Sequence, residues 1–328
     1  MADLCLRTYK EGDELQILEL FKQTFGRDMG IDYWNWRFRD NVEGKIQIEL
    51  MYDEELLVGH YAVAPAKMNF NNKLALTALS NNTMINPDYG RRGIFTKLAS
   101  NLYARIKDYG VQLVWGFPNQ ASYHGFVHRL NWLPIKDIPT LTLSKDNLKH
   151  FNLAQPKHKV ETISHFDPAF DDLWDRLRNE FASRFRYFVV RDSKYLNWRY
   201  VQNPKYQYKI FCVRKGDNYL GYAVTKFYSG GEQLMGDIVD IFCIFDKDVF
   251  LSLIQESINY LSQSASQICC WMNESCQFYE YLKEAGFVES SFVTHFGARP
   301  LLSLAEGERE YLAHYSNWYL TMGDSDVY

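Results

Sequence analysis

The stretch NPDYGRRGIFTKL, residues 86–98, places two adjacent arginines and two glycines between a strand-like run and a helix-like run. The preceding LALTALSNNTMI, residues 74–85, predicts a strand. After the turn, one apolar stripe of a predicted helix over residues 94–106 is formed by Ile94, Leu98, Leu102 and Ile106. The pattern therefore predicts a strand, a tight basic turn and a helix in direct succession.

Such a turn favours anion binding. The first amides of a helix have no partner inside the helix, and the helix dipole adds partial positive charge at that end. A turn that closes around Gly93 aims neighbouring amides at one point, and Arg91 and Arg92 add full charges. We expect a pyrophosphate cradle made by the amides of Arg92, Gly93, Ile94 and Phe95. A capped helix behind a solvated basic turn is the alternative.

The sequence also repeats itself. DYWNWRFRDNVEGKIQIELMYDEELLVG (32–59) aligns without a gap with KYLNWRYVQNPKYQYKIFCVRKGDNYLG (194–221). A second echo relates NQASYHGFVHRLNW, from Asn119, to NESCQFYEYLKEAGF, from Asn273. Two diverged copies of one α/β unit explain both echoes. We expect domains at residues 1–145 and 161–328, joined by a polar linker at 146–160.

The first copy is predicted to be a mixed α/β domain. Its expected elements are a helix over 11–25, hairpin strands over 45–53 and 56–70, the strand and helix around the basic turn, a strand over 111–117 and a helix over 120–130. The core-facing stripe of the first helix is expected at Leu15, Leu18, Phe21 and Phe25.

Composition and charge narrow the class of protein to which the sequence can belong. The 328 residues suffice for two domains, and 36 basic against 40 acidic residues argue against nucleic-acid binding through bulk charge. Six cysteines without CxxC or His-containing metal spacing indicate buried free thiols. His124 and His128, four residues apart, lack a nearby third ligand, so no metal is expected. With no apolar run of about 18 residues and no signal-peptide pattern, we expect a soluble cytoplasmic protein without membrane partners, monomeric or homodimeric.

The basic turn and the segment after it resemble a known family. NPDYGRRGIF resembles the acyl-coenzyme-A-binding motif of the GNAT acyltransferases, in which Pro-Glu/Asp-Tyr leads into Arg/Gln-x-x-Gly-x-Gly/Ala. Asn119, Ser122 and Phe126 resemble a later segment of that family. Gly90 and Phe95 depart from the motif, standing where the family has Arg/Gln and its second Gly. The second copy lacks the Arg-Arg-Gly turn in DIVDIFCIFDKDVFLSLIQ (237–255), so it resembles a degenerate GNAT-like domain.

The resemblance implies an acyl-coenzyme A donor. Strand-end backbone groups would contact the pantetheine arm, the turn would hold the diphosphate, and the following helix would contact the arm or the thiol end. The implied coenzyme-binding residues are Met84, Ile85, Arg91, Arg92, Gly93, Ile94, Phe95, Thr96, Asn119, Ser122 and Phe126.

The implied chemistry is attack of a neutral amine on a thioester, with a strand amide polarising the carbonyl oxygen. His60 is the candidate base, and Asn82, holding a water, is the other. The leaving thiol, with a pKa of about 8.5, needs little acid help. The tyrosine that the family often uses as acid falls on Phe126, so Tyr123 is the substitute. A satisfied sheet histidine and an aromatic packing residue are the alternative interpretations of His60 and Tyr123.

The acceptor is also suggested by resemblance. YWNWRF (33–38) and GDSD (323–326) resemble segments of tandem bacterial enzymes that N-acylate nucleotide-linked amino sugars for surface polysaccharides. This implies transfer of an acetyl or short hydroxyacyl group, such as 3-hydroxybutanoyl, to a dTDP-type amino sugar. Candidate sugar contacts are Trp34, Arg37, Asp324 and Asp326; scaffold packing and an exposed acidic terminus are the alternatives. An acyltransferase for aminoglycoside, peptide or protein amines, and a non-catalytic acyl-coenzyme-A-binding protein, are the rival functions.

Overall fold

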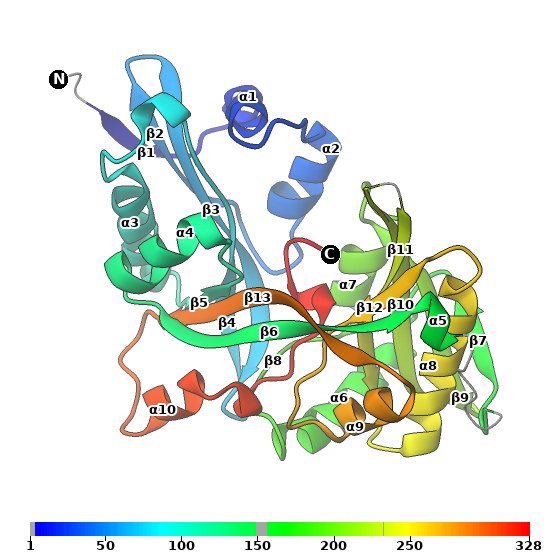
Figure 1. Ribbon diagram of the computed structural model, residues 1–328. Helices are drawn as coiled ribbons and strands as arrows, with labels where there is room; N and C mark the ends of the chain where they lie inside the picture. The colour runs from blue at the N-terminus through cyan, green and yellow to red at the C-terminus, as the bar shows by residue number, and fades with distance from the viewer. Residues whose placement is uncertain (1–3, 149–155, 232) are drawn as a thin grey trace. The chain divides into compact units, whose positions relative to one another are not determined.

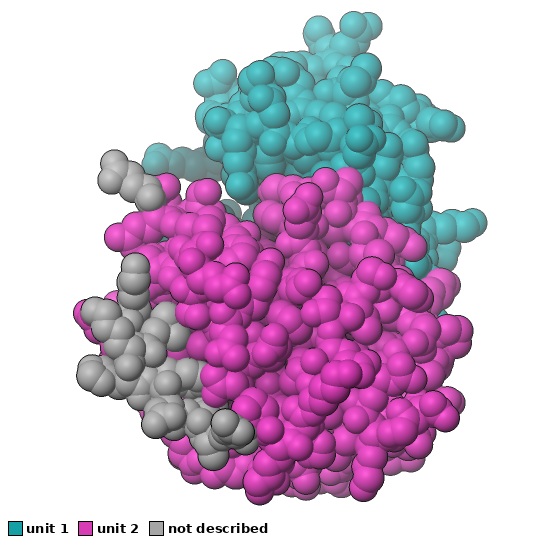
Figure 2. All heavy atoms as spheres, turned by 90° about the vertical axis from the view of Figure 1, so that its right-hand side faces the viewer, with its two compact units in different colours: residues 1–68, 74–136, 295–313 teal, residues 69–73, 137–294, 314–328 magenta. Residues whose placement is uncertain are grey.

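A computed structural model describes residues 4–148, 156–231 and 233–328 (Figure 1). The chain divides into two compact units, coloured separately in Figure 2. The first unit comprises residues 1–68, 74–136 and 295–313, and the second comprises 69–73, 137–294 and 314–328. Residues 149–155 of the predicted linker lie outside the described residues. The domain limits expected from the sequence stay a prediction.

The first copy has the strands and helices that its periodicity predicts. Its strands are β1 (Cys5–Thr8), β2 (Gln47–Asp53), β3 (Leu56–Phe70), β4 (Lys73–Ile85), β5 (Leu113–Gly116) and β6 (Leu133–Ser144). Its helices are α1 (Glu14–Phe25), α2 (Ile31–Trp34) continued by the π-helical η1 (Asn35–Arg39), the 3-10 turn η2 (Pro87–Tyr89), α3 (Ile94–Asp108), α4 (Gln120–His124) continued by the π-helical η3 (Gly125–Arg129), and α5 (Lys145–Leu148).

In the first unit, α3 lies on one side of β3, and α1 and α2 lie on the other (Figure 1). A hydrophobic cluster fills each side. One cluster joins Val58 and Tyr61 of β3 to the apolar stripe of α3. The other joins Leu57 and Ala62 of the same strand to α1 and α2. Because neighbouring residues of a strand point to opposite faces, β3 carries both clusters and separates the α3 side from the α1 side.

The stripe expected for α1 was right at Leu18 and Phe21, which pack in the cluster around this helix, and wrong at Leu15 and Phe25. Leu15 is 76% exposed and Phe25 is 41% exposed, whereas the buried residues are Ile17, Leu20 and Phe21. Both sets recur at helical spacing, and the second set is the one that packs against Trp34 and Phe38.

The second copy repeats the order of elements. Its strands are β7 (Val160–Ile163), β8 (Tyr187–Val189), β9 (Lys209–Lys215), β10 (Asn218–Gly230), β11 (Gln233–Cys243), β12 (Gln267–Cys270) and β13 (Val288–Pro300). Its helices are α6 (Ala169–Ala182), α7 (Ser193–Leu196) with the π-helical η4 (Asn197–Val201), α8 (Lys247–Leu261), α9 (Gln277–Glu284) and α10 (Glu308–Ala313), followed by the 3-10 turns η5 (Tyr315–Asn317) and η6 (Met322–Asp324). The repeated Asn-Trp-Arg segment forms the same α-to-π transition in both copies.

The last strand of each copy pairs outside its own copy. In the first unit, β5 pairs antiparallel with β13, with Gly116 opposite Gly297. In the second unit, β12 pairs antiparallel with β6, with Cys270 opposite Leu141. Each unit therefore contains a strand that comes from the other half of the chain.

Helices α3 and α8, with 15 residues each, are the longest in the described part of the chain, and none there is both long and apolar enough to span a bilayer. All six cysteines are free thiols; Cys5 is exposed and the other five are buried.

Candidate functional site

The N-terminus of α3 is open. Its N-cap residue, Gly93, has a φ of 74° and no side chain to cap the helix. The first helical hydrogen bond runs from the amide of Lys97 to the Gly93 carbonyl, over 3.1 Å. The preceding amides, of Ile94, Phe95 and Thr96, therefore have no acceptor within the helix. A Cβ added to Gly93 would meet no heavy atom within 4 Å, so the turn is open at this residue.

The turn before α3 is held by polar contacts and carries two exposed cations. Tyr89 donates from its hydroxyl to Asp53 over 2.6 Å, which ties the turn to the end of β2. Arg91, with a φ of 62°, and Arg92 are both exposed, and the Arg92 guanidinium lies 4.6 Å from the centre of the Tyr89 ring. Two positive charges therefore flank the free amides, as the sequence predicts.

A close approach between β3 and α3 fixes where the helix begins. A Cβ added to Gly59 would lie 2.6 Å from Cγ2 of Ile94, the first residue of α3. Only glycine at position 59 lets the start of the helix lie this close to the strand.

The corresponding helix of the second copy is closed. Asp246, the N-cap of α8, accepts hydrogen bonds from the amides of Asp248, over 2.8 Å, and Val249, over 3.0 Å. Its carboxylate occupies the position that an anionic ligand would take at α3. These amides of α8 are therefore already bonded, unlike those at the start of α3. An Asp before an apolar helical run is a helix-start signal that the sequence offers.

Strand β4 extends beyond its partner. It pairs in parallel with β5 through Ala78 with Val114 and Leu79 with Trp115. β5 ends at Gly116, whereas β4 continues to Ile85 and carries Asn82 at a φ of 35°. The end of β4 therefore presents an irregular strand edge beside α3. Of the two residues expected there, Met84 buries its side chain against the α1 cluster and Ile85 packs partly against the α3 cluster, so backbone groups are what this edge offers to a ligand.

His60 is not the exposed base that the sequence suggests. Its side chain is fully buried, and Nδ1 lies 2.8 Å from the Asn82 carbonyl, so Nδ1 carries the proton and donates it. Burial lowers the pKa of His60 to about 4, although the hydrogen bond to Asn82 opposes this shift. A buried, neutral imidazole cannot reach the amine of a substrate. His60 instead holds the Asn82 carbonyl at the irregular point of β4.

The segment after β5 caps a helix. Asn119 accepts the Ser122 amide over 2.9 Å and the Ser122 hydroxyl over 3.0 Å, so these two residues contact each other at the start of α4. Phe126 is 3% exposed and packs against Phe95 with 4.9 Å between ring centres, which makes it a core residue and not an exposed ligand contact. The Tyr123 ring lies 4.5 Å from His295, as expected for an aromatic packing residue.

Two candidate sugar contacts are buried in the first unit. Trp34 is fully buried and lies in the α1 cluster with Phe38, which contradicts the expectation that it faces a ligand. Arg37 is also buried and donates to the Asn81 side chain over 2.6 Å and to the Tyr33 hydroxyl over 2.7 Å. Scaffold packing, the alternative interpretation, is therefore the one that fits Trp34 and Arg37.

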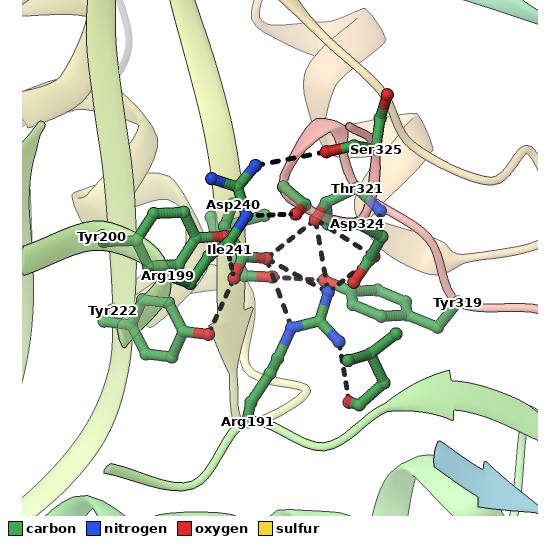
Figure 3. Close-up of polar contacts among 12 residues, drawn as sticks. Arg191, Arg199, Tyr200, Tyr222, Asp240, Ile241, Tyr319, Thr321, Asp324 and Ser325 are labelled. Carbon is green, nitrogen blue, oxygen red and sulfur yellow. Dashed lines mark hydrogen bonds and ion pairs between the residues drawn. The ribbon is translucent and has the colours of Figure 1, made fainter. Parts of the chain in front are cut away.

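Asp324 is likewise part of the interior (Figure 3). Its carboxylate is 3% exposed and accepts a hydrogen bond from Arg191 over 2.8 Å, and Arg191 also pairs with Asp240 at 3.3 Å. Burial and the Asp240 charge raise the pKa of Asp324, and Arg191 opposes them. Asp326 is partly buried. Both the candidate sugar contact and its alternative, an exposed acidic terminus, are therefore wrong for Asp324, which binds Arg191 in the interior.

The rings of His124 and His128 contact each other at a tilt of 43°, with 4.6 Å between ring centres. Over residues 4–148, 156–231 and 233–328, no group of three His, Cys, Asp or Glu side chains is arranged to hold a metal ion.

The sequence and the fold were both compared with known proteins. Residues 6–135 match the model of the GNAT acetyltransferase domain. No curated protein matches the chain by sequence. This match, together with the solved structures, confirms the predicted GNAT-like α/β fold and supports the predicted transferase class.

Solved structures extend the GNAT likeness over most of the chain. A GCN5-related N-acetyltransferase from Anabaena variabilis has a TM-score of 0.69 at 12% identity, over 92% of this chain and 73% of its own. One from Kribbella flavida has a TM-score of 0.66 at 14% identity, over 91% and 71%. Saccharomyces cerevisiae N-myristoyltransferase with bound myristoyl-CoA has a TM-score of 0.60 at 10% identity, over 91% and 83%. At sequence identities of 10–14%, these similarities show a shared fold and nothing more.

Proposed function

We propose that the protein transfers an acyl group from coenzyme A to a primary amine within one ternary complex, and that the N-terminus of α3 binds the coenzyme diphosphate. The open helix end carries this proposal, because α3 leaves its first amides beside Arg91 and Arg92 whereas α8 is closed by Asp246. The coenzyme site is therefore assigned to the first copy.

The edge of β4 would complete the donor site. Beyond Leu79 the strand has left its pairing with β5, so its amides and carbonyls can pair with the amide groups of an extended pantetheine arm. An amide at this edge would polarise the thioester carbonyl as the amine attacks. Asn119 and Ser122, at the start of α4, remain the candidate contacts for the arm, with their side chains at the helix start.

For the acceptor we propose a nucleotide-linked amino sugar of the dTDP type, acylated with an acetyl or short hydroxyacyl group for surface polysaccharide synthesis in the cytoplasm. This rests on the resemblance of the YWNWRF and GDSD segments, because Trp34 and Asp324 themselves are buried. Arg37 is buried as well, so of the four candidate contacts Asp326, which is partly buried, remains a candidate. A monomer or homodimer stays the prediction for the assembly.

A panel assay tests donor and acceptor separately. Purified protein is given acetyl- or 3-hydroxybutanoyl-coenzyme A with dTDP- and UDP-linked amino sugars, aminoglycosides and peptides, and thiol release is followed. Turnover with an amino sugar is expected. Turnover only with aminoglycosides or peptides would remove the sugar and keep the acyl transfer. Tight donor binding without turnover on any amine would instead favour a non-catalytic coenzyme-binding protein.

A further inference from the structure

Four side chains of the first unit form a buried hydrogen-bonded chain. Trp132 Nε1 lies 3.1 Å from the Tyr103 hydroxyl, which lies 2.8 Å from the Tyr61 hydroxyl, which lies 3.0 Å from Ser80 Oγ. Ser80 is 9% exposed and the other three are at most 3% exposed. This hydrogen-bonded chain thus runs from Trp132 through α3 and β3 to Ser80 of β4.

The direction of this chain is fixed by its inner end. An indole N–H only donates, so the Tyr103 oxygen accepts from Trp132. If Tyr61 also donated to Tyr103, the Tyr103 proton would be left without an acceptor in the interior, at a cost of about 1–3 kcal/mol. Tyr103 therefore donates to Tyr61, and Tyr61 donates to Ser80. The Ser80 hydroxyl proton is then not used within these four side chains and can be donated to a ligand.

The chain also strengthens that last donor. Hydrogen bonds in series polarise one another, so each hydroxyl that accepts a bond becomes a better donor. The Arg299 guanidinium, 5.1 Å from the centre of the Tyr103 ring, adds positive charge near the inner end. Ser80 is consequently a stronger hydrogen-bond donor than an isolated serine.

Ser80 lies where β4 and β5 part. It directly follows Leu79, the last β4 residue paired with β5, and a Cβ added to Gly116 would lie 3.0 Å from the Ser80 Cβ. Its contact with Tyr61, a member of the α3 cluster, places Ser80 on the α3 side of the sheet. Five residues, or about 17 Å of strand, separate it from Ile85 at the start of the basic turn.

We propose that Ser80 donates a hydrogen bond to the sulfur of the coenzyme, with Tyr61, Tyr103 and Trp132 as positioning residues. The inference rests on the proposed function, because an arm that runs along β4 from a diphosphate at α3 ends near Ser80. In the reaction the amine nitrogen bonds to the thioester carbon, the C–S bond breaks with its electron pair going to sulfur, and the ammonium proton leaves to water.

Ser80 keeps its own proton during this step. Burial raises the pKa of Tyr61 and of Tyr103, so neither tyrosine supplies a proton, and the indole behind them passes none. Stabilising a thiolate by a hydrogen bond is sufficient, because a thiol of pKa about 8.5 already leaves readily near neutral pH.

The test measures the thiol of bound coenzyme A. Thiolate absorbance is titrated with pH for free coenzyme A and for its complexes with wild type, Ser80→Ala and Tyr61→Phe. In wild type we expect the bound thiol to titrate about one pH unit lower than the free thiol, a tenfold change in ionisation. Ser80→Ala should abolish this shift and Tyr61→Phe should reduce it. With the most active acceptor of the panel, Ser80→Ala should lower kcat about tenfold with little change in KM for the donor.

Thr77→Val is the matched control. Thr77 also carries a buried hydroxyl on β4, but it donates to the Ala66 carbonyl and takes no part in the hydrogen-bonded chain from Trp132 to Ser80. Its loss should therefore leave the thiol titration unchanged. Identical titrations and kcat values for wild type and Ser80→Ala would overturn the inference while leaving the proposed function intact. Absence of coenzyme A binding to wild type would instead reject the proposed function. If Ser80→Ala does not fold, Tyr61→Phe decides, because it removes one hydroxyl and keeps the ring.

Discussion

Gly93→Asp should close the coenzyme site of the first copy in the way that Asp246 closes α8. The new carboxylate would lie beside the free amides of α3 and repel a diphosphate. With about 5 Å to each of two phosphate charges and an effective dielectric constant of about 40, the repulsion is about 3 kcal/mol. Coenzyme A affinity should therefore fall on the order of 100-fold.

Gly93→Asn is the neutral control for this change. Position 93 has a φ of 74°, where a residue other than glycine costs about 1 kcal/mol, and Asp and Asn are among the side chains that tolerate it best. Both variants should lose a similar amount of folding stability. Their coenzyme affinities should nevertheless differ widely, because only one adds charge.

Calorimetric titration with coenzyme A at low salt distinguishes the two variants, and thermal unfolding verifies that both are folded. Equal affinities for Gly93→Asp and Gly93→Asn would refute the electrostatic reasoning. A difference that shrinks in high salt would support it further, because salt screens a charge at this exposed turn.

Three further outcomes concern stability. Because the pKa of His60 is about 4 in the fold and 6.5 when unperturbed, only the unfolded state binds this proton between those pH values. Between pH 7 and pH 4 the free energy of unfolding in urea should fall by about 3 kcal/mol more for wild type than for His60→Gln, and parallel curves would contradict this. Burial raises the pKa of Asp237 to about 7 and lowers that of Lys226 to about 8, so folding destabilises both charged forms near neutral pH. The double variant Lys226→Met with Asp237→Leu should therefore have a free energy of unfolding about 1–4 kcal/mol higher at pH 7, and a lower melting temperature would argue against this. Arg191→Met leaves two buried carboxylates without their cation and should cost about 3–5 kcal/mol in urea unfolding, whereas a loss below 1 kcal/mol would show that the pair is not desolvated.

Local patterns predicted the elements that position the site. The strand over 56–70 has the predicted limits, and the helix predicted over 94–106 runs to Asp108. Both predictions depend on spacing within one segment and on the turn residues at its ends, and tertiary packing left these features unchanged. The open N-terminus of α3 follows from Gly93 in the same way.

Predictions that depended on distant partners did less well. The stripe predicted for α1 was wrong at Leu15 and Phe25 because two apolar stripes at helical spacing overlap in this helix, and only packing against Trp34 decides between them. Asp324 was a candidate sugar contact, with an exposed terminus as the alternative, but it is buried against Arg191, which lies 133 residues away in sequence. Ser80 gave no local signal, since its chain to Tyr61 and beyond forms only when the strands and α3 assemble.

The most direct test of the diphosphate site follows backbone amides by NMR. Deuterated, 15N-labelled protein is titrated with coenzyme A and, separately, with pantetheine, which lacks the diphosphate. Coenzyme A should shift the amides of Ile94, Phe95 and Thr96 strongly downfield, as expected for new hydrogen bonds to phosphate oxygens, and pantetheine should leave them in place. Unchanged resonances for these three amides at saturating coenzyme A would contradict the assignment of the site.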